Sequence, residues 1–466
     1  MRPMTLAVEF DSPGQIRNEV KVGNEISDAA RLFEESAVQK VRVRILPFVL
    51  LLFVVAFLDR INIGFAALTM NKELGITSEQ YGLIAEIFFV GYFIFEIPSN
   101  LLLHRIGARI WIARILITWG IVATLTGFVH NVTQLYVARF LLGLAEAGYL
   151  PGIILYLTYW FRQRDQARSI SLFLTGAPVA SILGAPISGL ILDRVHWLGM
   201  SSWRWLLVLE GIPAIVCGFL AYFLLPNSPS EAKFLTAAEK AAIQEGLSRE
   251  EQMKLDQHQY SVFQAMTHGR VWLLASIHFG MLIGFYTLNF WVPQLMKSLA
   301  AAYSNSAIGL LVMIPSLAGL VAMVLVSRNS DRKLERRYHI AIPAVLGGTA
   351  LALLGITSST VLSLILLSLL AMGVYSYLGP FWTLPSTFLS GYSAAAGIAL
   401  INSLGSFAGF VGPSVVGYLS QRAGSLQSAL PLASVPLFAA AILVVLLPKE
   451  ARRRAKVSEI EREGNR

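Results

Sequence analysis

Apolar residues occur along this chain in blocks of about twenty, separated by short polar stretches. A helix of that length spans ~30 Å, the thickness of the hydrocarbon core of a bilayer. Twelve such blocks lie near residues 45–66, 80–103, 110–129, 132–157, 168–192, 203–225, 270–295, 306–327, 338–357, 360–386, 391–420 and 427–448. The pattern therefore predicts an all-α integral membrane protein with twelve transmembrane helices.

One polar interruption is much longer than the others and follows the sixth block. It carries a capping-box pattern, Thr236 to Glu239, which predicts a short charged helix. We expect a cytoplasmic tail, a six-helix bundle, a cytoplasmic linker, a second six-helix bundle and a second cytoplasmic tail, over residues 1–44, 45–226, 227–269, 270–448 and 449–466. Similarly placed basic loops at 103–109 and 330–337 indicate that the two bundles repeat one unit, and such transporters bind substrate between the halves.

Composition agrees with this class, and the distribution of charge predicts the orientation. Hydrophobic residues make up 55% and charged residues 14% of the 466 positions, whereas a soluble domain has about 25% charged residues. Thirty of the 37 Lys and Arg fall in the tails and in loops on one side, and five fall in loops on the other. By the positive-inside rule, we expect a multi-pass protein of the cell inner (plasma) membrane with both termini in the cytoplasm. The net charge of +9 then reflects topology, so no nucleic-acid partner is expected, and the single cysteine, Cys217, excludes an internal disulfide.

The remaining two basic residues, Arg60 and Arg139, lie inside predicted spans with acids close by. Asp59 precedes Arg60, and Glu146 follows Arg139 by seven residues. A charge at mid-bilayer costs roughly 2.5–3.5 kcal/mol, so these residues are expected to serve a function. Arginine matches a carboxylate with two parallel hydrogen bonds, and a half-buried acid can carry a proton. The alternative is a structural network in which acids neutralise both arginines permanently.

Helical geometry constrains how these four residues can pair. Arg139 and Glu146 lie on nearly one face but about 10 Å apart along the axis, so each needs another partner or water. Asp59 and Arg60 point about 100° apart and cannot both face one neighbour.

Other polar residues within the spans are candidates for further roles. Glu86 either lines the cavity, where it would take part in proton coupling, or reaches toward the outside, whereas Glu96 and Glu210 are expected to pair structurally. The last six blocks contain no acid and no mid-span Lys or Arg. They offer neutral groups, and the candidate substrate contacts there are Tyr286, Asn289, Trp382, Ser386, Asn402 and Ser403. Gly and Pro interrupt the runs 284–293 and 379–385, which is typical of gates and binding sites but also of ordinary packing.

Several classes of function lack their sequence signals. The chain has no G-x-x-x-x-G-K-[ST] motif for ATP, and its His and Cys residues have no metal-ligand spacing. No nucleophile–base signature favours an enzyme. We therefore expect a protein that is not an enzyme, has no cofactor and is driven by a proton gradient.

Six motifs in order resemble a known family over residues 45 to 448. They are Leu58-Asp59-Arg60-Ile61-Asn62-Ile63-Gly64, Phe88-Phe89-Val90-Gly91-Tyr92 with Ile97-Pro98-Ser99-Asn100, Arg139-Phe140-Leu141-Leu142-Gly143 with Glu146-Ala147-Gly148, Trp203-Arg204-Trp205 with Glu210-Gly211-Ile212-Pro213, Ser330-Asp331-Arg332, and Ala399-Leu400-Ile401-Asn402-Ser403-Leu404-Gly405. The chain resembles the major facilitator superfamily, and within it the anion:cation symporter family of organic-acid transporters. Members of that family carry sugar acids, tartrate, phthalate and hydroxyphenylacetate.

The resemblance implies the major facilitator fold and uptake of a carboxylated solute with protons. It implies that Arg60 and Arg139 contact the carboxylate, that Asp59 and Glu146 carry protons, and that Asn402 touches substrate. The implied gating residues are His104, Arg105, Asp331 and Arg332. The sequence departs from the family pattern at three positions: His104 replaces an acid of the gating loop, Phe57 replaces a frequent Tyr, and Glu86 stands at a usually small or neutral position.

The sequence therefore predicts a proton-coupled symporter for a small organic anion that works by alternating access in the lipid bilayer, as a monomer. An exporter of organic anions remains open, because the motifs do not fix the direction of flow. A transporter-like receptor that binds an acid without flux is the alternative from another class; the linker is short for a signalling domain. A membrane enzyme is a third possibility that no motif favours.

Overall fold

The described part of the chain is helical wherever it has regular secondary structure. The computed structural model describes residues 32–256, 262–385, 388–389 and 391–447. Its first half contains α2 (Leu46–Leu74), α3 (Ser78–Ile106), α4 (Ala108–Thr126), α5 (Val132–Glu146), α6 (Tyr149–Thr158), α7 (Gln163–Leu174), α8 (Gly176–Arg194) and α9 (Ser202–Leu224). After α10 (Ala237–Asp256) and α11 (Val262–Thr267) come α12 (Gly269–Leu299), α13 (Asn305–Lys333), α14 (Tyr338–Leu354), α15 (Thr360–Ser376), α16 (Leu378–Trp382), α17 (Gly391–Ala423) and α18 (Leu430–Val445).

These helices confirm the prediction of an all-α, multi-pass membrane protein. Ten helical stretches of the described chain are long and apolar enough to cross a membrane, and α14 is a shorter apolar helix. Each of the twelve predicted blocks coincides with one helix or with two consecutive ones. The bounds predicted for the two bundles, the linker and the tails stay a prediction.

One predicted span is interrupted at the residue of greatest interest. The fourth block is split into α5, which ends at Glu146, and α6, which begins at Tyr149. Gly148 adopts a φ of 81°, where a side chain would be strained, and a Cβ there would collide with Ser99. The break therefore places Glu146 at the C-terminus of a helix in the interior of the protein.

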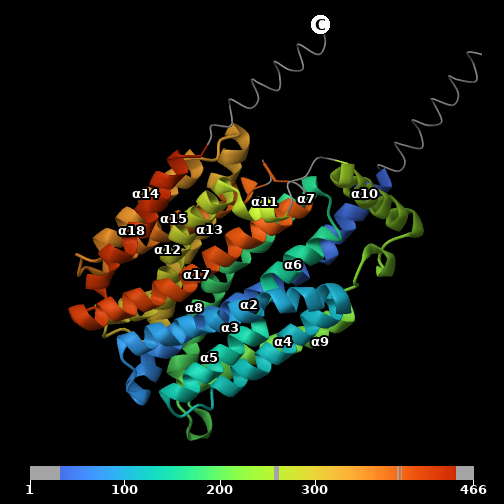
Figure 1. Cartoon of the computed structure of the whole chain (residues 1–466). Helices are drawn as coiled ribbons and strands as arrows, with labels where there is room; N and C mark the ends of the chain where they lie inside the picture. The colour runs from blue at the N-terminus through green and yellow to red at the C-terminus, as the bar shows by residue number, and fades with distance from the viewer. Residues whose placement is uncertain (1–31, 257–261, 386–387, 390, 448–466) are drawn as a thin grey trace, which may run out of the picture.

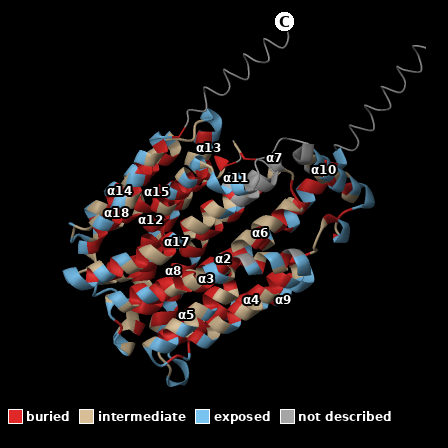
Figure 2. Cartoon of the chain, viewed as in Figure 1, coloured by how far each residue is buried: buried red, intermediate tan, exposed pale blue. Residues whose placement is uncertain are grey.

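Helices from the two halves of the chain lie side by side (Figure 1). Within the first half α4 packs along α9, and within the second half α14 packs along α15 and α18. Two long contacts join the halves, α3 with α17 and α8 with α13. Buried residues follow the facing sides of the helices (Figure 2).

The halves are packed tightly at one end of the molecule, here called the far end, where α2 ends and α3 begins. A Cβ on Gly64 of α2 would come within 3.0 Å of the Phe290 carbonyl oxygen of α12. The Tyr81 hydroxyl donates to the same carbonyl at 2.8 Å, and the Asn71 amide donates to Gln294 at 3.3 Å. The structure is therefore closed at its far end.

Asp193, at the end of α8, joins the halves by capping a helix of the other half. Its carboxylate accepts from the backbone N–H groups of Asn305 and Ser306 at 3.1 and 2.6 Å, and from the Asn305 amide at 2.9 Å. These groups form the first turn of α13, whose N-terminus favours negative charge. Ser304 caps the same helix from within its own loop.

The opposite end, here called the linker end, carries α10 and a helix over residues 32–44 (Figure 1). This helix lies within the segment predicted as a polar tail. Ser36 and Lys40 donate to the Glu239 carboxylate of α10 at 2.7 and 2.9 Å. The predicted capping box is confirmed, because Glu239 also accepts from the Thr236 N–H at 2.9 Å. The Lys40 ammonium, together with the Thr236 N–H and the Ser36 hydroxyl, lowers the pKa of Glu239 to about 2.

Candidate functional site

Arg60 of α2 and Glu146 of α5 form an ion pair in the interior of the first half. The Arg60 Nη2 donates to Glu146 Oε1, and the side chains are 12% and 0% exposed. Glu146 is the last residue of α5, directly before the break, and its side chain reaches α2 at Arg60. Sequence spacing indicated that Glu146 needs a partner other than Arg139, and in the structure that partner is Arg60.

Arg139 lies next to this pair but is not neutralised by a direct bond to an acid. Its Nε donates to the Ile84 carbonyl at 3.2 Å, and its Nη2 has no partner among the described residues. The Phe88 ring contacts both arginines, with its centroid 5.2 Å from the Arg60 guanidinium carbon and 5.1 Å from that of Arg139. One nitrogen of the buried Arg139 guanidinium is therefore left without a protein partner in the described part of the chain.

Asp59 is held on the other side of α2 by two donors. The Trp119 Nε1 of α4 donates to Asp59 Oδ2 at 2.6 Å, and the Asn62 amide donates to Oδ1 at 3.1 Å. Asp59 and Arg60 thus face different neighbours, as their adjacent positions predicted. Asp59, Arg60, Arg139 and Glu146 still form one electrostatic cluster.

The other predicted acids of the first half lie at different depths. Glu86 of α3 is buried beside Tyr136 of α5, and its Oε2 has no partner among the described residues. Glu96 faces Asn402 and Ser403 of α17, which belongs to the other half.

The candidate substrate contacts of the second half are divided between several places. Tyr286 lies beside Arg60 and packs its ring on Phe89 at 4.8 Å. Trp382 instead packs against His278 at 5.1 Å. Asn402 and Ser403 face Glu96, as described, and Ser386 lies outside the described residues.

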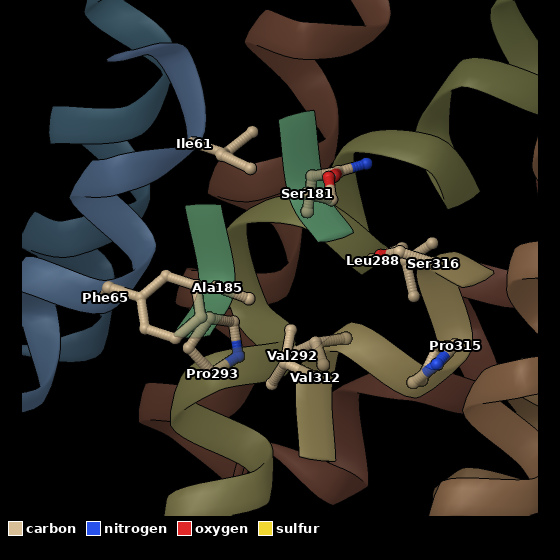
Figure 3. A pocket seen from close by; sticks show the side chains of 11 residues that line it. Ile61, Phe65, Ser181, Ala185, Leu288, Val292, Pro293, Val312, Pro315 and Ser316 are labelled. Carbon is tan, nitrogen blue, oxygen red and sulfur yellow. The ribbon is translucent and has the colours of Figure 1, made fainter. Parts of the chain in front are cut away.

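Asn289 lies in a polar contact between the halves beside a small cavity. Its Oδ1 accepts from Ser181 at 3.3 Å and from Tyr375 at 3.2 Å. The cavity, with room for one or two water molecules, lies between α2, α8, α12 and α13 (Figure 3). Ile61 and Phe65 line it from α2, whereas neither arginine does. The structure therefore places Asn289 apart from the arginine cluster.

The candidate gating residues lie at the linker end. Arg105, Asp331 and Arg332 are exposed, and Asp331 pairs with Arg336 at 2.7 Å. His104 lies in α3, but its side chain is outside the described part of the chain.

Two residues in the membrane-spanning helices had not been singled out from the sequence, and a third, Glu96, had been expected to pair structurally. His278 of α12 is buried, bonds to the Tyr377 hydroxyl at 3.0 Å and stacks on Phe381 at 4.9 Å. Arg114 lies inside α4 over the Trp111 ring, so a further arginine falls well inside a predicted span. The sequence signals that could have identified the first two were a histidine in the middle of a predicted span and an arginine inside the third apolar block.

Comparison with known proteins agrees with this architecture. The model of the Major Facilitator Superfamily matches residues 49–413. A "Putative tartrate transporter" of Agrobacterium vitis is 43% identical over 90% of this chain and 92% of its own length. The "Putative metabolite transport protein NicT" of Pseudomonas putida is 40% identical over 88% and 94% of the two chains. A "Quinolone resistance transporter" of Acinetobacter baumannii is 35% identical over 92% and 99%.

A solved structure shares the fold. It is a bacterial homolog of the human lysosomal transporter Spinster in an inward-facing, unoccupied conformation, with a TM-score of 0.66 and 17% identity over 87% of this chain and 95% of that one. The helical architecture, the family match over most of the chain and the transporter relatives all agree. The chain therefore belongs to the Major Facilitator Superfamily and is a membrane transporter, not an enzyme.

Proposed function

We propose that this transporter is a proton-coupled symporter that imports a small organic anion, a carboxylate such as tartrate, a sugar acid or an aromatic acid. The observation that carries the proposal is the buried Arg60–Glu146 pair beside Arg139, whose Nη2 is unpartnered among the described residues. Relatives named as tartrate and metabolite transporters support this class of substrate.

The Arg60–Glu146 pair links the anion to the proton. While Glu146 is a carboxylate it occupies Arg60, and a substrate carboxylate would meet a buried negative charge. Protonation of Glu146 removes that charge and frees the guanidinium for a bidentate bond to substrate. Anion and proton then load together, and neither crosses the apolar interior as an uncompensated charge.

Groups around the arginines supply the remaining contacts. Tyr286 lies beside Arg60 from the second half, and Asn402 and Ser403 face Glu96. A substrate held by Arg60, Tyr286 and Asn402 would bridge the halves, which supports alternating access. Asp59 stays in the electrostatic cluster as a second proton site, and the exposed residues Arg105, Asp331 and Arg332, with His104, act in the gate at the linker end.

The charge distribution supports a location in the inner (plasma) membrane with both termini cytoplasmic, and we assign function to the monomer. The closed far end then faces outward. Export is a second candidate, because one relative of high coverage is named for quinolone resistance.

Thermal stability of the purified protein tests the anion site. Hydroxy, sugar and aromatic acids are compared with their neutral amides. A ligand at about one hundred times its Kd stabilises by about 2.7 kcal/mol. We expect stabilisation by one class of acid that is lost in Arg60→Ala. Equal stabilisation by the amides would contradict an arginine-bound carboxylate.

A further inference from the structure

Glu210 of α9 is a buried acid that the mechanism above does not use. The residue is 4% exposed, and the Ser188 hydroxyl of α8 donates to its Oε1 at 2.7 Å. Its Oε2 has no hydrogen-bond partner among the described residues. A purely structural contact between α9 and α8 would use only the oxygen that bonds to Ser188, so it does not explain why a carboxyl group with a second, unpartnered oxygen stands here.

No positive charge acts directly on the Glu210 carboxyl from the described residues of the elements packed against it. Helix α9 packs on α4, α2 and α8. From α8 Glu210 meets Ser188, and from α2 it meets Asn62 and Asp59. Asp59 is the charged group that acts on Glu210 among the described residues, and it has the same sign.

More distant charges on these elements are already engaged or lie at the ends. Arg204 of α9 pairs with Glu73 and donates to two carbonyls near the far end. Asp193 of α8 caps α13. On α4, Arg114 lies over Trp111 and is ten residues, almost three turns, before Thr124, which packs against Gly211 next to Glu210.

Two carboxyls joined in this way cannot both be charged at low cost. A buried carboxylate without a cation costs several kcal/mol, and a second carboxylate beside it adds repulsion. Both oxygens of Asp59 accept hydrogen bonds, from Trp119 and Asn62, so this residue can hold the negative charge. The arrangement at Glu210, with one free oxygen, suits the neutral acid, which needs to place a proton there.

The two acids lie at different depths. Glu210 is eight residues from the far-end start of α9, and Asp59 is fifteen residues from the far-end terminus of α2. At 1.5 Å per residue these positions are about 12 and 22 Å deep. Asn62 donates to Asp59 and lies within hydrogen-bonding reach of Glu210, so it connects them.

We propose that Glu210 and Asp59 form one proton site that holds a single shared proton, and that Glu210 receives this proton from the far end. The inference rests on the proposed proton-coupled function. When the proton moves inward, an O–H bond at Glu210 breaks and one at Asp59 forms, so the pair keeps a net charge of −1. Protonated Asp59 then no longer supports the charge of Arg139 in the arginine cluster, which couples the outer site to the anion site.

The protonation of Glu210 can be observed without transport. Difference infrared spectroscopy detects the carbonyl stretch of a protonated carboxylic acid in the purified protein. Glu210→Gln keeps an oxygen that accepts from Ser188 but has no titratable proton. We expect one protonated-carboxyl band of the wild type to disappear in this variant at neutral pH. An unchanged set of bands would overturn the proposal.

Transport in proteoliposomes tests the coupling. With the membrane potential clamped at zero and an imposed difference of about one pH unit, each proton lost from the cycle lowers the accumulation ratio about tenfold. We expect Glu210→Gln to lose about this factor while substrate exchange is retained. The matched control is Glu73→Gln. Glu73 accepts a hydrogen bond from Trp203 of α9, the helix that carries Glu210, but lies outside the Glu210–Asp59 network. This variant should accumulate substrate as the wild type does.

Asn62→Leu removes the side chain that connects Glu210 to Asp59 but leaves both acids in place. It provides a second test if Glu210→Gln does not fold. It keeps both acids, so the protonated-carboxyl band should remain while proton-driven accumulation falls. Wild-type accumulation in either variant would refute the shared site. Absence of proton-driven accumulation in the wild type itself would refute the proposed function instead, and the infrared result would still decide the protonation of Glu210.

Discussion

Removing the Asp193 carboxylate should open the far end. Asp193 is the cross-half cap of α13 and accepts from two backbone N–H groups and one side-chain amide, at Asn305 and Ser306. When the halves separate, these donors must turn to water. Asp193→Ala removes the cap and its charge in the closed state and leaves the open state unchanged.

The size of the effect follows from the contacts that are lost. Loss of an N-cap side chain costs about 0.5–2 kcal/mol, and a negative charge at a helix N-terminus contributes about 0.3–1 kcal/mol. Ser304 continues to cap α13, so part of the helix terminus stays satisfied. We expect a shift of about 1–2 kcal/mol toward the open far end, which raises the ratio of open to closed molecules about 5- to 30-fold.

Electron–electron distance measurements can quantify this ratio. In a Cys217→Ala background, labels at the exposed positions His196 and Tyr303 report the far-end separation of the halves. The longer-distance population should grow in Asp193→Ala and less in Asp193→Asn, which keeps one acceptor. Glu79→Ala, at an exposed acid of the same end, is the control and should match the parent. Identical distributions in Asp193→Ala and the parent would refute the role of the cap.

Three further predictions follow from packing, pH and the arginine fork. Gly143→Ala should lower the free energy of unfolding by about 1–3 kcal/mol, because a Cβ at this position would overlap the α3 backbone. Gly269→Ala, whose Cβ would meet open space, is the control, and the melting temperature should fall only in Gly143→Ala. Because the pKa of Glu239 is lowered, its carboxylate stabilises the docking of helix 32–44 fully above about pH 4.5, and this stabilisation is lost as the pH falls toward 2. Hydrogen exchange of that helix, corrected for the intrinsic rate, should therefore become faster over this pH range. Glu239→Gln should show the faster exchange already at neutral pH. Arg139→Lys keeps the charge but not the fork, so substrate affinity should fall at least about tenfold in calorimetry, and retained affinity would show that Arg139 does not bind the carboxylate.

The helices could be predicted from the sequence because their signal is local. Blocks of twenty apolar residues and the capping box at Thr236 depend on residues close in the chain, and both are confirmed. The break after Glu146 was missed, although Gly148 was visible, because only packing against Ser99 shows that this glycine ends the helix.

The pairing within the candidate site could not be predicted in the same way. Arg60 and Glu146 are separated by 86 residues, and the sequence indicated only that each lacked a local partner. Glu210 was expected to pair structurally, and it does bond to Ser188, but the charge that acts on it in the described part of the chain is Asp59, which has the same sign. Which charges meet is decided by tertiary packing, and a single sequence does not contain that information in a readable form.

Proton-driven accumulation in proteoliposomes tests the central claim most directly. The wild type and Glu146→Gln are compared for uptake of the acid that stabilises the protein, with and without an inward pH gradient. Coupling through the Arg60–Glu146 pair predicts that the wild type accumulates substrate above equilibrium, whereas Glu146→Gln still exchanges substrate but accumulates about tenfold less of it for an imposed difference of one pH unit. Accumulation by Glu146→Gln equal to that of the wild type would contradict the account.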